Sequence, residues 1–413
     1  RTRVIAQNGR TADGYTDGLG RRTKSIDDPA GLAIITQFQY YADSQLSKII
    51  DANRNETNYS YNSRGLKATE TYDDGKGWVF EYDPLGRQTS KTDGAGKTAT
   101  FDYSGLPNTL TVSYGGTASH SADITRFKSD ELLVEMETTE YANRIDVFMN
   151  AAGQKVKEAQ VLNPGTDDEQ AFEFAFEYFM TGGRKSMTIP SGRVYNYTRD
   201  DSGRLSSFKN AAEASNIFTV ERDAIGRDIG RQFGNGTDVD FTLADNGLMR
   251  NISHTFTTGS LAFGLTFDAS GHPLTKSNSR HSQLSESFGY DAIDRLVSYQ
   301  RAGTQTGLIK DHTFNLDGLG NWTSTTFDGN TETRSHNELN QVTARSGDLL
   351  EGATSPIALS YDDAGNINSD GYRSFVWDVH NRLKSVTVAA GAPVGTPGEY
   401  SYKYDVLGRR IMA

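Results

Sequence analysis

Residues 80–89 read F-E-Y-D-P-L-G-R-Q-T and contain the unit that is repeated through most of this chain. Phe80 and Tyr82 alternate with a charged residue, which is typical of a strand with one buried face. Asp83 can accept hydrogen bonds from backbone amides further along the chain, and the proline after it fixes φ at the first corner of a turn. Gly86 stands where a hairpin loop needs a left-handed residue. The stretch therefore predicts a strand, a tight turn and a return strand that begins at Arg87.

Similar turn signals recur from one end of the sequence to the other. About 18 of them lie between Gly20 and Gly408, at a mean spacing of about 23 residues. Asp294, Asn340 and Asn381 replace the glycine in some copies, and Asp and Asn are among the few other residues that tolerate the left-handed conformation. The repeat weakens between residues 115 and 185. Thr, Tyr, Phe and Val dominate between the turns, which predicts strands rather than helices.

The composition limits the possible functions. The chain has 413 residues, of which 35% are hydrophobic and 42 are glycine, with 20 Tyr and 20 Phe, as expected for a β-rich protein with many turns. A net charge of −11 argues against nucleic acid or an anionic membrane as a partner. The absence of Cys excludes disulfides and Cys-based metal sites or nucleophiles. No apolar run approaches the roughly 18 residues of a membrane span, and no signal peptide opens the chain, so we expect a fragment or a processed piece.

The repeat has a geometric consequence. One hairpin cannot bury its own apolar face, so neighbouring hairpins must pair edge to edge. Two strands per repeat give on the order of 36 strands and a strip roughly 170 Å long, at about 4.8 Å per strand. Because sheets twist, the strip should curl; closed once, it would form a ring roughly 55 Å across, too wide for side chains to fill. We expect an all-β fold in which repeated β-hairpins form a long, spiralling antiparallel sheet that is hollow.

We expect one array over residues 1–413, with surface loops near residues 163–168 and 389–398. The repeated Tyr-Asp-x-x-Gly-Arg resembles the YD-repeat or RHS (rearrangement hot spot) family. The resemblance implies a spiralling β-strip that forms a hollow shell. In bacterial RHS proteins and insecticidal toxin complexes the shell encloses a toxic C-terminal polypeptide, and in animal teneurins a similar barrel is an adhesion scaffold. The residues that define the clearest copies are expected to be structural: Tyr82, Asp83, Gly86, Arg87, Tyr290, Asp291, Arg295, Tyr361, Asp362, Gly365, Tyr404, Asp405, Gly408 and Arg409.

The chain departs from that family at its C-terminal end. RHS cores usually end in a self-cleaving segment with an Asp-Pro-x-Gly-Leu motif, whereas the sequence ends at Ala413 without one. Residues 28–32 read D-P-A-G-L but lie near the N-terminus within a repeat, so we interpret them as a turn. The chain therefore looks like a fragment of a larger shell wall.

Other motifs imitate functional sites. Residues 94–98 resemble the end of a phosphate-binding loop but lack its upstream glycine and its strand-to-helix context, which favours a hairpin turn. Residues 366–371 begin like a calcium loop, but Trp377 replaces its last ligand, which favours a turn. Residues 167–169 are interpreted as a solvated acidic loop. A spatial pair of carboxylates of the glycosidase type, and sugar stacking on exposed aromatic residues, stay open as alternatives. The histidines lack zinc-ligand spacing, and they are His120, His254, His272, His281, His312, His336 and His380.

The sequence thus predicts a non-enzymatic structural shell of an exported bacterial protein, which encapsulates a C-terminal toxin or other polypeptide cargo by steric confinement. An alternative is an extracellular adhesion or surface-structure protein that binds glycans or proteins through the same strip. A third is an enzyme within residues 115–185. The expected partners are the enclosed polypeptide and the remaining shell segments or copies of the chain. No nucleic acid, membrane span, cofactor, metal or catalytic residue is expected, and the expected location is secreted or at the cell surface.

Overall fold

The computed structural model describes residues 1–413 except 7–8, 105–108, 116–122, 131–132, 140, 302–308, 349–355, 394 and 413. Almost all of its regular structure is β-strand, and one short 3-10 helix, η1 (Ser282–Leu284), interrupts the pattern. Thr, Tyr, Phe and Val fill the strands as the sequence predicts, and turn residues separate them at short intervals.

The strands follow one another with short connections. The first sixteen are β1 (Thr2–Ile5), β2 (Thr11–Thr16), β3 (Arg22–Asp27), β4 (Ile34–Tyr40), β5 (Leu46–Ile50), β6 (Glu56–Tyr61), β7 (Lys67–Thr71), β8 (Gly77–Tyr82), β9 (Gln88–Thr92), β10 (Thr98–Asp102), β11 (Thr109–Tyr114), β12 (Asp123–Asp130), β13 (Leu133–Thr138), β14 (Asn143–Met149), β15 (Lys155–Leu162) and β16 (Gln170–Tyr178). The next sixteen are β17 (Arg184–Thr188), β18 (Val194–Arg199), β19 (Leu205–Asn210), β20 (Phe218–Arg222), β21 (Asp228–Phe233), β22 (Asp238–Leu243), β23 (Met249–Phe256), β24 (Gly259–Phe267), β25 (Pro273–Asn278), β26 (Glu286–Tyr290), β27 (Leu296–Arg301), β28 (Lys310–Leu316), β29 (Trp322–Phe327), β30 (Asn330–His336), β31 (Val342–Gly347) and β32 (Ile357–Ala358). The last are β33 (Ser360–Tyr361), β34 (Ile367–Ser369), β35 (Arg373–Trp377), β36 (Leu383–Val388), β37 (Gly398–Ser401), β38 (Lys403–Tyr404) and β39 (Arg410–Met412).

Strands β1 to β32 form one antiparallel sheet of 32 strands, in which each strand pairs with the next in chain order. Successive turns therefore lie alternately along the two long edges of the strip. The turns that follow the motif tyrosines, such as residues 83–87 after Tyr82, lie along one edge, which we call the motif edge. The connections between hairpins, such as residues 72–76 and 93–97, lie along the other, which we call the linker edge.

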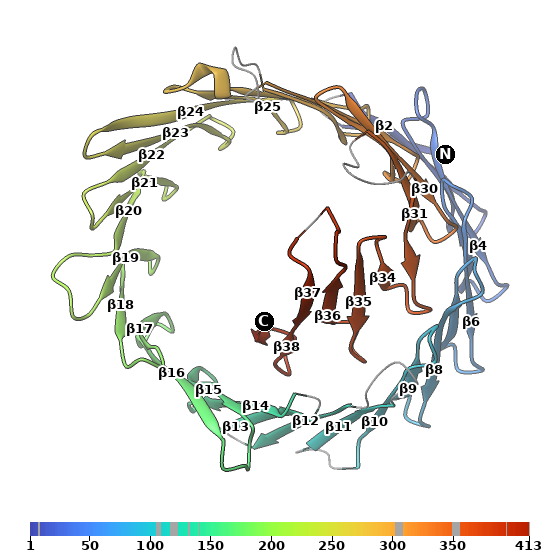
Figure 1. The fold of residues 1–413 in the computed structure, drawn as a ribbon, viewed down its shortest axis with the longest axis horizontal. Helices are drawn as coiled ribbons and strands as arrows, with labels where there is room; N and C mark the ends of the chain where they lie inside the picture. Colours follow the sequence, from blue (N-terminus) through green and yellow to red (C-terminus); the bar gives the residue numbers. More distant parts are fainter. Residues whose placement is uncertain are drawn as a thin grey trace.

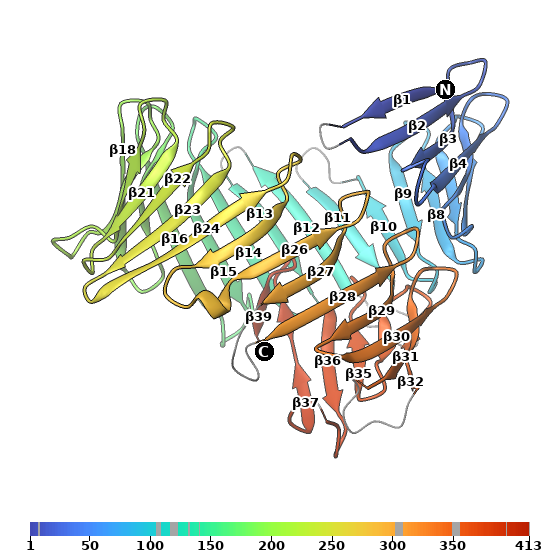
Figure 2. The same ribbon diagram turned by 90° about the horizontal axis from the view of Figure 1, so that it is seen from above.

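The sheet curls into a spiral of slightly more than one winding (Figure 1). The second winding begins where Asp294, in the turn after β26, meets Arg10 of the first. Its strands β28 to β31 lie below β8 and β9 in Figure 2. Loops separated by roughly 25 strands meet there, so one winding contains roughly 25 strands. With tilted strands at the usual spacing, this circumference gives a ring on the order of 40–50 Å across. The strip thus overlaps itself instead of closing once, and the expected all-β hollow spiral is confirmed.

The wall exposes both of its faces. The chain has an accessible surface of 23335 Å². A compact monomer of 45.3 kDa is expected to expose about 16,000 Å². Among the described residues only ten hydrophobic side chains are buried, and they include Val112, Ile145 and Val386. The chain therefore forms a one-layer wall instead of a body around a central core.

Two details of the C-terminal region differ from the sequence predictions. The long sheet ends at β32, and the last strands form a five-stranded sheet (β33–β37) and a pair (β38–β39), which lie inside the ring in Figure 1. A kink at Leu359 separates β32 from β33, although its amide still donates to the carbonyl of Thr343 at 2.9 Å. The prediction of a turn over residues 366–371 is wrong in part, because Ile367–Ser369 form β34. Residues 163–169 lie between β15 and β16, and residues 389–397 lie between β36 and β37, apart from the undescribed residue 394.

Candidate functional site: the motif turn and the seam between windings

The turn after β8 explains the spacing of the repeated motif. Asp83 Oδ1 accepts the backbone N–H groups of Leu85 and Arg87, both at 2.9 Å, and Arg87 Nε donates to Asp83 Oδ2 at 2.6 Å. The Asp83 amide donates to the Arg87 carbonyl at 2.9 Å, and Gly86 has a φ of +84°. One carboxylate thus organises three donors, which is why Asp and Arg stand four residues apart.

The same three side-chain hydrogen bonds recur at other turns. They are formed by the pairs Asp17 and Arg21, Asp200 and Arg204, Asp223 and Arg227, Asp291 and Arg295, Asp378 and Arg382, and Asp405 and Arg409. Asn366 takes the place of arginine beside Asp362 and donates to its Oδ2 at 2.9 Å. The guanidinium hydrogen bonds of Arg21 and Arg227 lower the pKa values of Asp17 and Asp223. These carboxylates are therefore charged anchors of the turn.

The tyrosine of the motif ties each hairpin to the preceding one. The hydroxyl of Tyr82 donates to the carbonyl of Lys67 at 2.9 Å, and that of Tyr290 donates to the carbonyl of Pro273 at 2.9 Å. Tyr361 and Tyr404 make the same bond to the carbonyls of Val342 and Leu383, at 2.9 and 2.8 Å. Burial raises the pKa values of Tyr290, Tyr361 and Tyr404, so these hydroxyls stay protonated donors.

The arginine of the motif points the other way along the strip. Arg295 Nη1 donates to the carbonyl of Asp317 in the next motif turn at 2.7 Å, and Arg382 Nη1 donates to the carbonyl of Asp405 at 3.2 Å. The turns of Arg295 and Arg382 are thus bonded forward through arginine, and the motif tyrosines bond their hairpins backward. The bonds lie outside the backbone ladder and join hairpins that are consecutive in the chain.

The structure places the motif aspartates, glycines and arginines that the sequence predicted in the turns after β8, β26, β33 and β38, and the four motif tyrosines are the last residues of those strands. The left-handed conformation expected at Asp294, Asn340 and Asn381 is confirmed, with φ values of 70°, 61° and 61°. The turn expected at residues 28–32 is present between β3 and β4. The copy at residues 101–106 is described only as far as residue 104.

The sequence reasoning missed the role of the linker edge. Linker loops of the first winding contact motif turns of the second, and we call this line of contacts the seam. Arg10 Nη1 lies 3.4 Å from Asp294 Oδ2, and Asn53 Nδ2 donates to Asp317 Oδ2 at 2.8 Å. Further along, Lys97 donates to the Asn381 side chain.

Some of the most buried side chains lie at the C-terminal part of the seam. The side chain of Asp378 is 0% exposed, and it accepts a hydrogen bond from the Tyr141 hydroxyl at 3.0 Å across the seam. Asn143 is fully buried; its amide donates to the carbonyl of Tyr404 at 2.9 Å and its Oδ1 accepts the amide of Val406 at 3.1 Å. Because burying a polar group is costly unless it is bonded, these matched bonds fix which loops meet.

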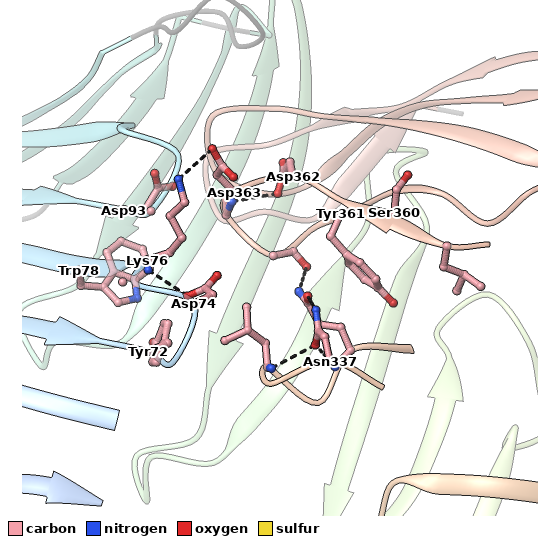
Figure 3. A pocket seen from close by; sticks show the side chains of 17 residues that line it. Tyr72, Asp74, Lys76, Trp78, Asp93, Asn337, Ser360, Tyr361, Asp362 and Asp363 are labelled. Carbon is pink, nitrogen blue, oxygen red and sulfur yellow. Dashed lines mark hydrogen bonds and ion pairs between the residues drawn. The ribbon is translucent and has the colours of Figure 1, made fainter. Parts of the chain in front are cut away.

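A cavity of about 320 Å³ lies in the seam between residues 72–78 and 93–94 of the first winding and turns of the second (Figure 3). Lys76 Nζ and Asp363 Oδ2 are 3.3 Å apart and join its two sides. A Cβ atom on Gly94 would lie 2.6 Å from the carbonyl oxygen of Asp363. Residues 94–98, which imitate a phosphate-binding loop, thus belong to a linker turn whose glycine allows the windings to approach.

The remaining sequence candidates lie in several parts of the chain. His380 is in a motif turn at the seam, where its ring centroid lies 4.2 Å from that of Tyr114. Residues 167–169 form an exposed loop, and His120 falls in an undescribed segment. His272 lies close to two carboxylates, which the sequence analysis did not foresee. Among the residues that the structure describes, no helix is long and apolar enough to cross a membrane.

No protein family or curated protein matches the sequence significantly. Solved structures do match the fold. The chain superposes over 98% of its length on 23% of a chain in the crystal structure of TcdB2-TccC3-TEV, with a TM-score of 0.78 and 16% identity. It matches a Tc holotoxin pore of Photorhabdus luminescens with a TM-score of 0.73 and 15% identity, over 99% of this chain and 23% of that one. It matches TcdB2-TccC3 with a TM-score of 0.72 and 15% identity, over 97% and 24%.

The chain therefore spans less than a quarter of each matched chain. At this level of identity the likeness concerns the fold. The repeated Tyr-Asp-x-x-Gly-Arg, the spiral sheet and these matches agree, and the expected RHS-type β-strip fold is confirmed: the chain shares its fold with the matched part of TcdB2-TccC3.

Proposed function

We propose that the chain is a wall segment of a non-enzymatic shell that encloses a polypeptide in an exported bacterial protein. The single observation that carries this proposal is the large surface of a one-layer spiral, 23335 Å², combined with a small set of buried hydrophobic residues. A sheet that leaves both faces exposed has an inner face available for something other than its own side chains.

In this proposal the wall acts by steric confinement, and no residue makes or breaks a bond. Two sets of contacts keep such a wall closed. Tyrosine and arginine of the motif stiffen the strip along its length, and the seam holds successive windings together. The motif residues predicted from the sequence would thus be structural. In the second winding, motif turns would contribute both to the bonds along the strip and to the seam.

The proposed partners are an enclosed toxin-type polypeptide and the other segments that complete the shell. The matched chains are about four times as long as this one, so about three quarters of such a shell would come from other segments or from further copies of this chain. The net charge of −11 makes nucleic acid an unsuitable partner.

The test uses the product of the complete reading frame that contains this sequence. Under native conditions, limited proteolysis followed by mass spectrometry should leave any enclosed non-repeat segment intact, and electron cryomicroscopy should reveal polypeptide density inside the wall. The matched control is the same segment expressed alone, which should be digested quickly. A complete assembly whose interior holds solvent only, with all non-repeat segments as sensitive as the free control, would contradict the proposal. Saturable binding of such an empty assembly to glycans or cell surfaces would support the adhesion alternative.

A further inference from the structure

Two neighbouring motif turns depart from the repeat at positions that face each other. In the turn that begins at Asp268, His272 stands where seven other motif turns carry arginine. In the next motif turn, which begins at Asp291, Asp294 stands where most copies carry glycine and keeps the left-handed φ of 70°. The sequence analysis noted the second departure only because aspartate tolerates that conformation.

The geometry of the motif edge explains why these two positions meet. At the turns that keep the usual residues, the arginine of one turn covers the glycine of the next, as Arg204 does when its Nη1 donates to the carbonyl of Gly226 at 3.1 Å. A Cβ atom at position 226 would collide with that guanidinium. The shorter side chain of His272 leaves room for the carboxylate of Asp294, so the two departures are compatible as a pair.

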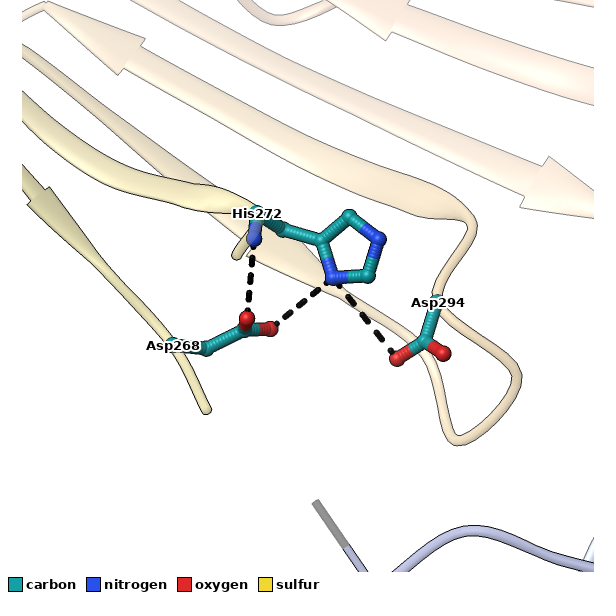
Figure 4. A group of neighbouring side chains, drawn as sticks. All are labelled: Asp268, His272 and Asp294. Carbon is teal, nitrogen blue, oxygen red and sulfur yellow. Dashed lines mark hydrogen bonds and ion pairs between the residues drawn. The ribbon is translucent and has the colours of Figure 1, made fainter. Parts of the chain in front are cut away.

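The result is a cluster of one imidazole and two carboxylates (Figure 4), which we call the Asp–His–Asp cluster. His272 Nδ1 lies 3.1 Å from Asp268 Oδ2 and 3.9 Å from Asp294 Oδ1. One ligand atom from each residue lies within 4.8 Å of the others. Tetrahedral zinc with bonds of about 2.0–2.2 Å holds its ligand atoms about 3.3 Å apart, so a small rotation of Asp294 brings all three into range.

The surroundings of the cluster suit a metal ion. Asp268 Oδ1 accepts the backbone amides of Ser270 and His272 at 2.8 and 2.9 Å, which fixes the carboxylate and directs Oδ2 toward the imidazole. Asp294 uses its other oxygen, Oδ2, for Arg10 across the seam, so Oδ1 faces His272. A cavity of about 550 Å³ lined by Asp268, Asp294 and Asp28 adjoins the cluster and has room for water ligands.

We propose that Asp268, His272 and Asp294 bind a divalent transition metal ion such as Zn²⁺ at the start of the seam. Imidazole with carboxylates favours a transition metal over Ca²⁺ or Mg²⁺, which prefer oxygen ligands only. The ion cross-links two successive motif turns at a place where the usual arginine bond between turns is missing. It lies beside the Arg10 contact, so it also steadies the turn that meets the first winding.

The test measures metal binding directly. The chain, treated with a chelator and dialysed, is titrated with Zn²⁺ by calorimetry and with Co²⁺ by visible absorption. One ion per chain is expected, with the d–d absorption of Co²⁺ in a low-symmetry nitrogen and oxygen site. Mg²⁺ at the same concentration should not compete. Absence of saturable uptake of either transition ion would overturn the proposal.

Two variants locate the site. His272→Arg combined with Asp294→Gly restores the residues that other turns carry, so the double variant should keep the circular dichroism spectrum and melting temperature of the metal-free chain. The double variant should lose the metal site. Its affinity for Zn²⁺ should fall by more than the roughly 10- to 100-fold that is typical when a residue hydrogen-bonded to a metal ligand is changed. Asp294→Asn keeps the size of the side chain and should weaken binding in the same direction. Equal uptake by the wild type and both variants would assign the ion to other residues and refute the Asp–His–Asp cluster.

Discussion

Replacing Asp378 by alanine is the most direct test of how the seam holds the second winding. The substitution removes four hydrogen bonds to one carboxylate: the amides of His380 and Arg382 at 2.9 Å each, the Arg382 guanidinium at 2.6 Å and the Tyr141 hydroxyl at 3.0 Å. The Asp378 side chain is 0% exposed and that of Arg382 is 16% exposed. Removing one partner of a buried ion pair costs about 3–5 kcal/mol, because the other charge stays buried.

The matched control is Asp223→Ala. Asp223 makes the same three bonds within its own turn, to the amides of Ile225 and Arg227 and to the Arg227 guanidinium, but its side chain is 21% exposed. It has the turn chemistry of Asp378 without the bond from Tyr141. We therefore expect a clearly smaller and purely local effect.

Native-state hydrogen exchange read by mass spectrometry is the appropriate assay, because a long repeat array opens in parts and a single unfolding free energy is not defined for it. For Asp378→Ala, amide protection in β35 and β36 should fall by about 100-fold or more, in line with a loss of about 3 kcal/mol. Protection at the start of β14, next to Tyr141, should fall too. Equal losses in the two variants, or an Asp378→Ala effect confined to residues 378–382, would refute the idea that the seam couples the windings.

Three further outcomes test the turn and the seam. Gly86→Ala should destabilise its hairpin by about 1–2 kcal/mol because φ is +84°, whereas Gly18→Ala, with open space around it, should change little; equal losses of amide protection in the two hairpins would contradict this. Gly94→Val should increase proteolysis at the seam, because a Cβ atom there lies 2.6 Å from the Asp363 carbonyl, and an unchanged cleavage pattern would count against close packing. The pKa of Asp17 is lowered in the folded chain by the Arg21 hydrogen bond, so its contribution is present above the unfolded pKa of about 4 and is lost as the pH falls below it. Thermal melts should accordingly stay level down to about pH 5 and decline below about pH 4, and a decline between pH 7 and pH 5 would assign the transition to other groups.

The local part of the fold was predictable because its chemistry is contained in five or six consecutive residues. Asp83, Gly86 and Arg87 specify a turn by their spacing, and Tyr82 marks the end of the strand before it. Recurrence of that unit predicted hairpins, their order and the curvature of a strip too wide to lie flat. The hydrogen bond from Tyr82 to Lys67 was not predicted, because the partner is a backbone carbonyl that carries no sequence signal.

The seam could not be predicted from the same information. Which linker loop meets which motif turn depends on the number of strands per winding, and this follows from twist and tilt accumulated over about 25 strands. The contacts of Asn143 with Tyr404 and Val406 are therefore a property of the whole spiral. The pairing of His272 with Asp294 was not predicted either. Neither residue signals a site by itself, and they meet only because the strip places two consecutive motif turns side by side.

The overlap of the windings constrains how this protein can change its length during evolution. Duplication or deletion of a hairpin in the first winding would leave every neighbouring strand pair intact. If the hairpin lies between residues 143 and 290, the change would nevertheless shift the opposing loop by one position for Asp294, Asp317, Asp378 and Tyr404 alike. Hairpins added before Arg10 or after Val406 change none of these separations, so drift in hairpin number is expected to concentrate outside that interval.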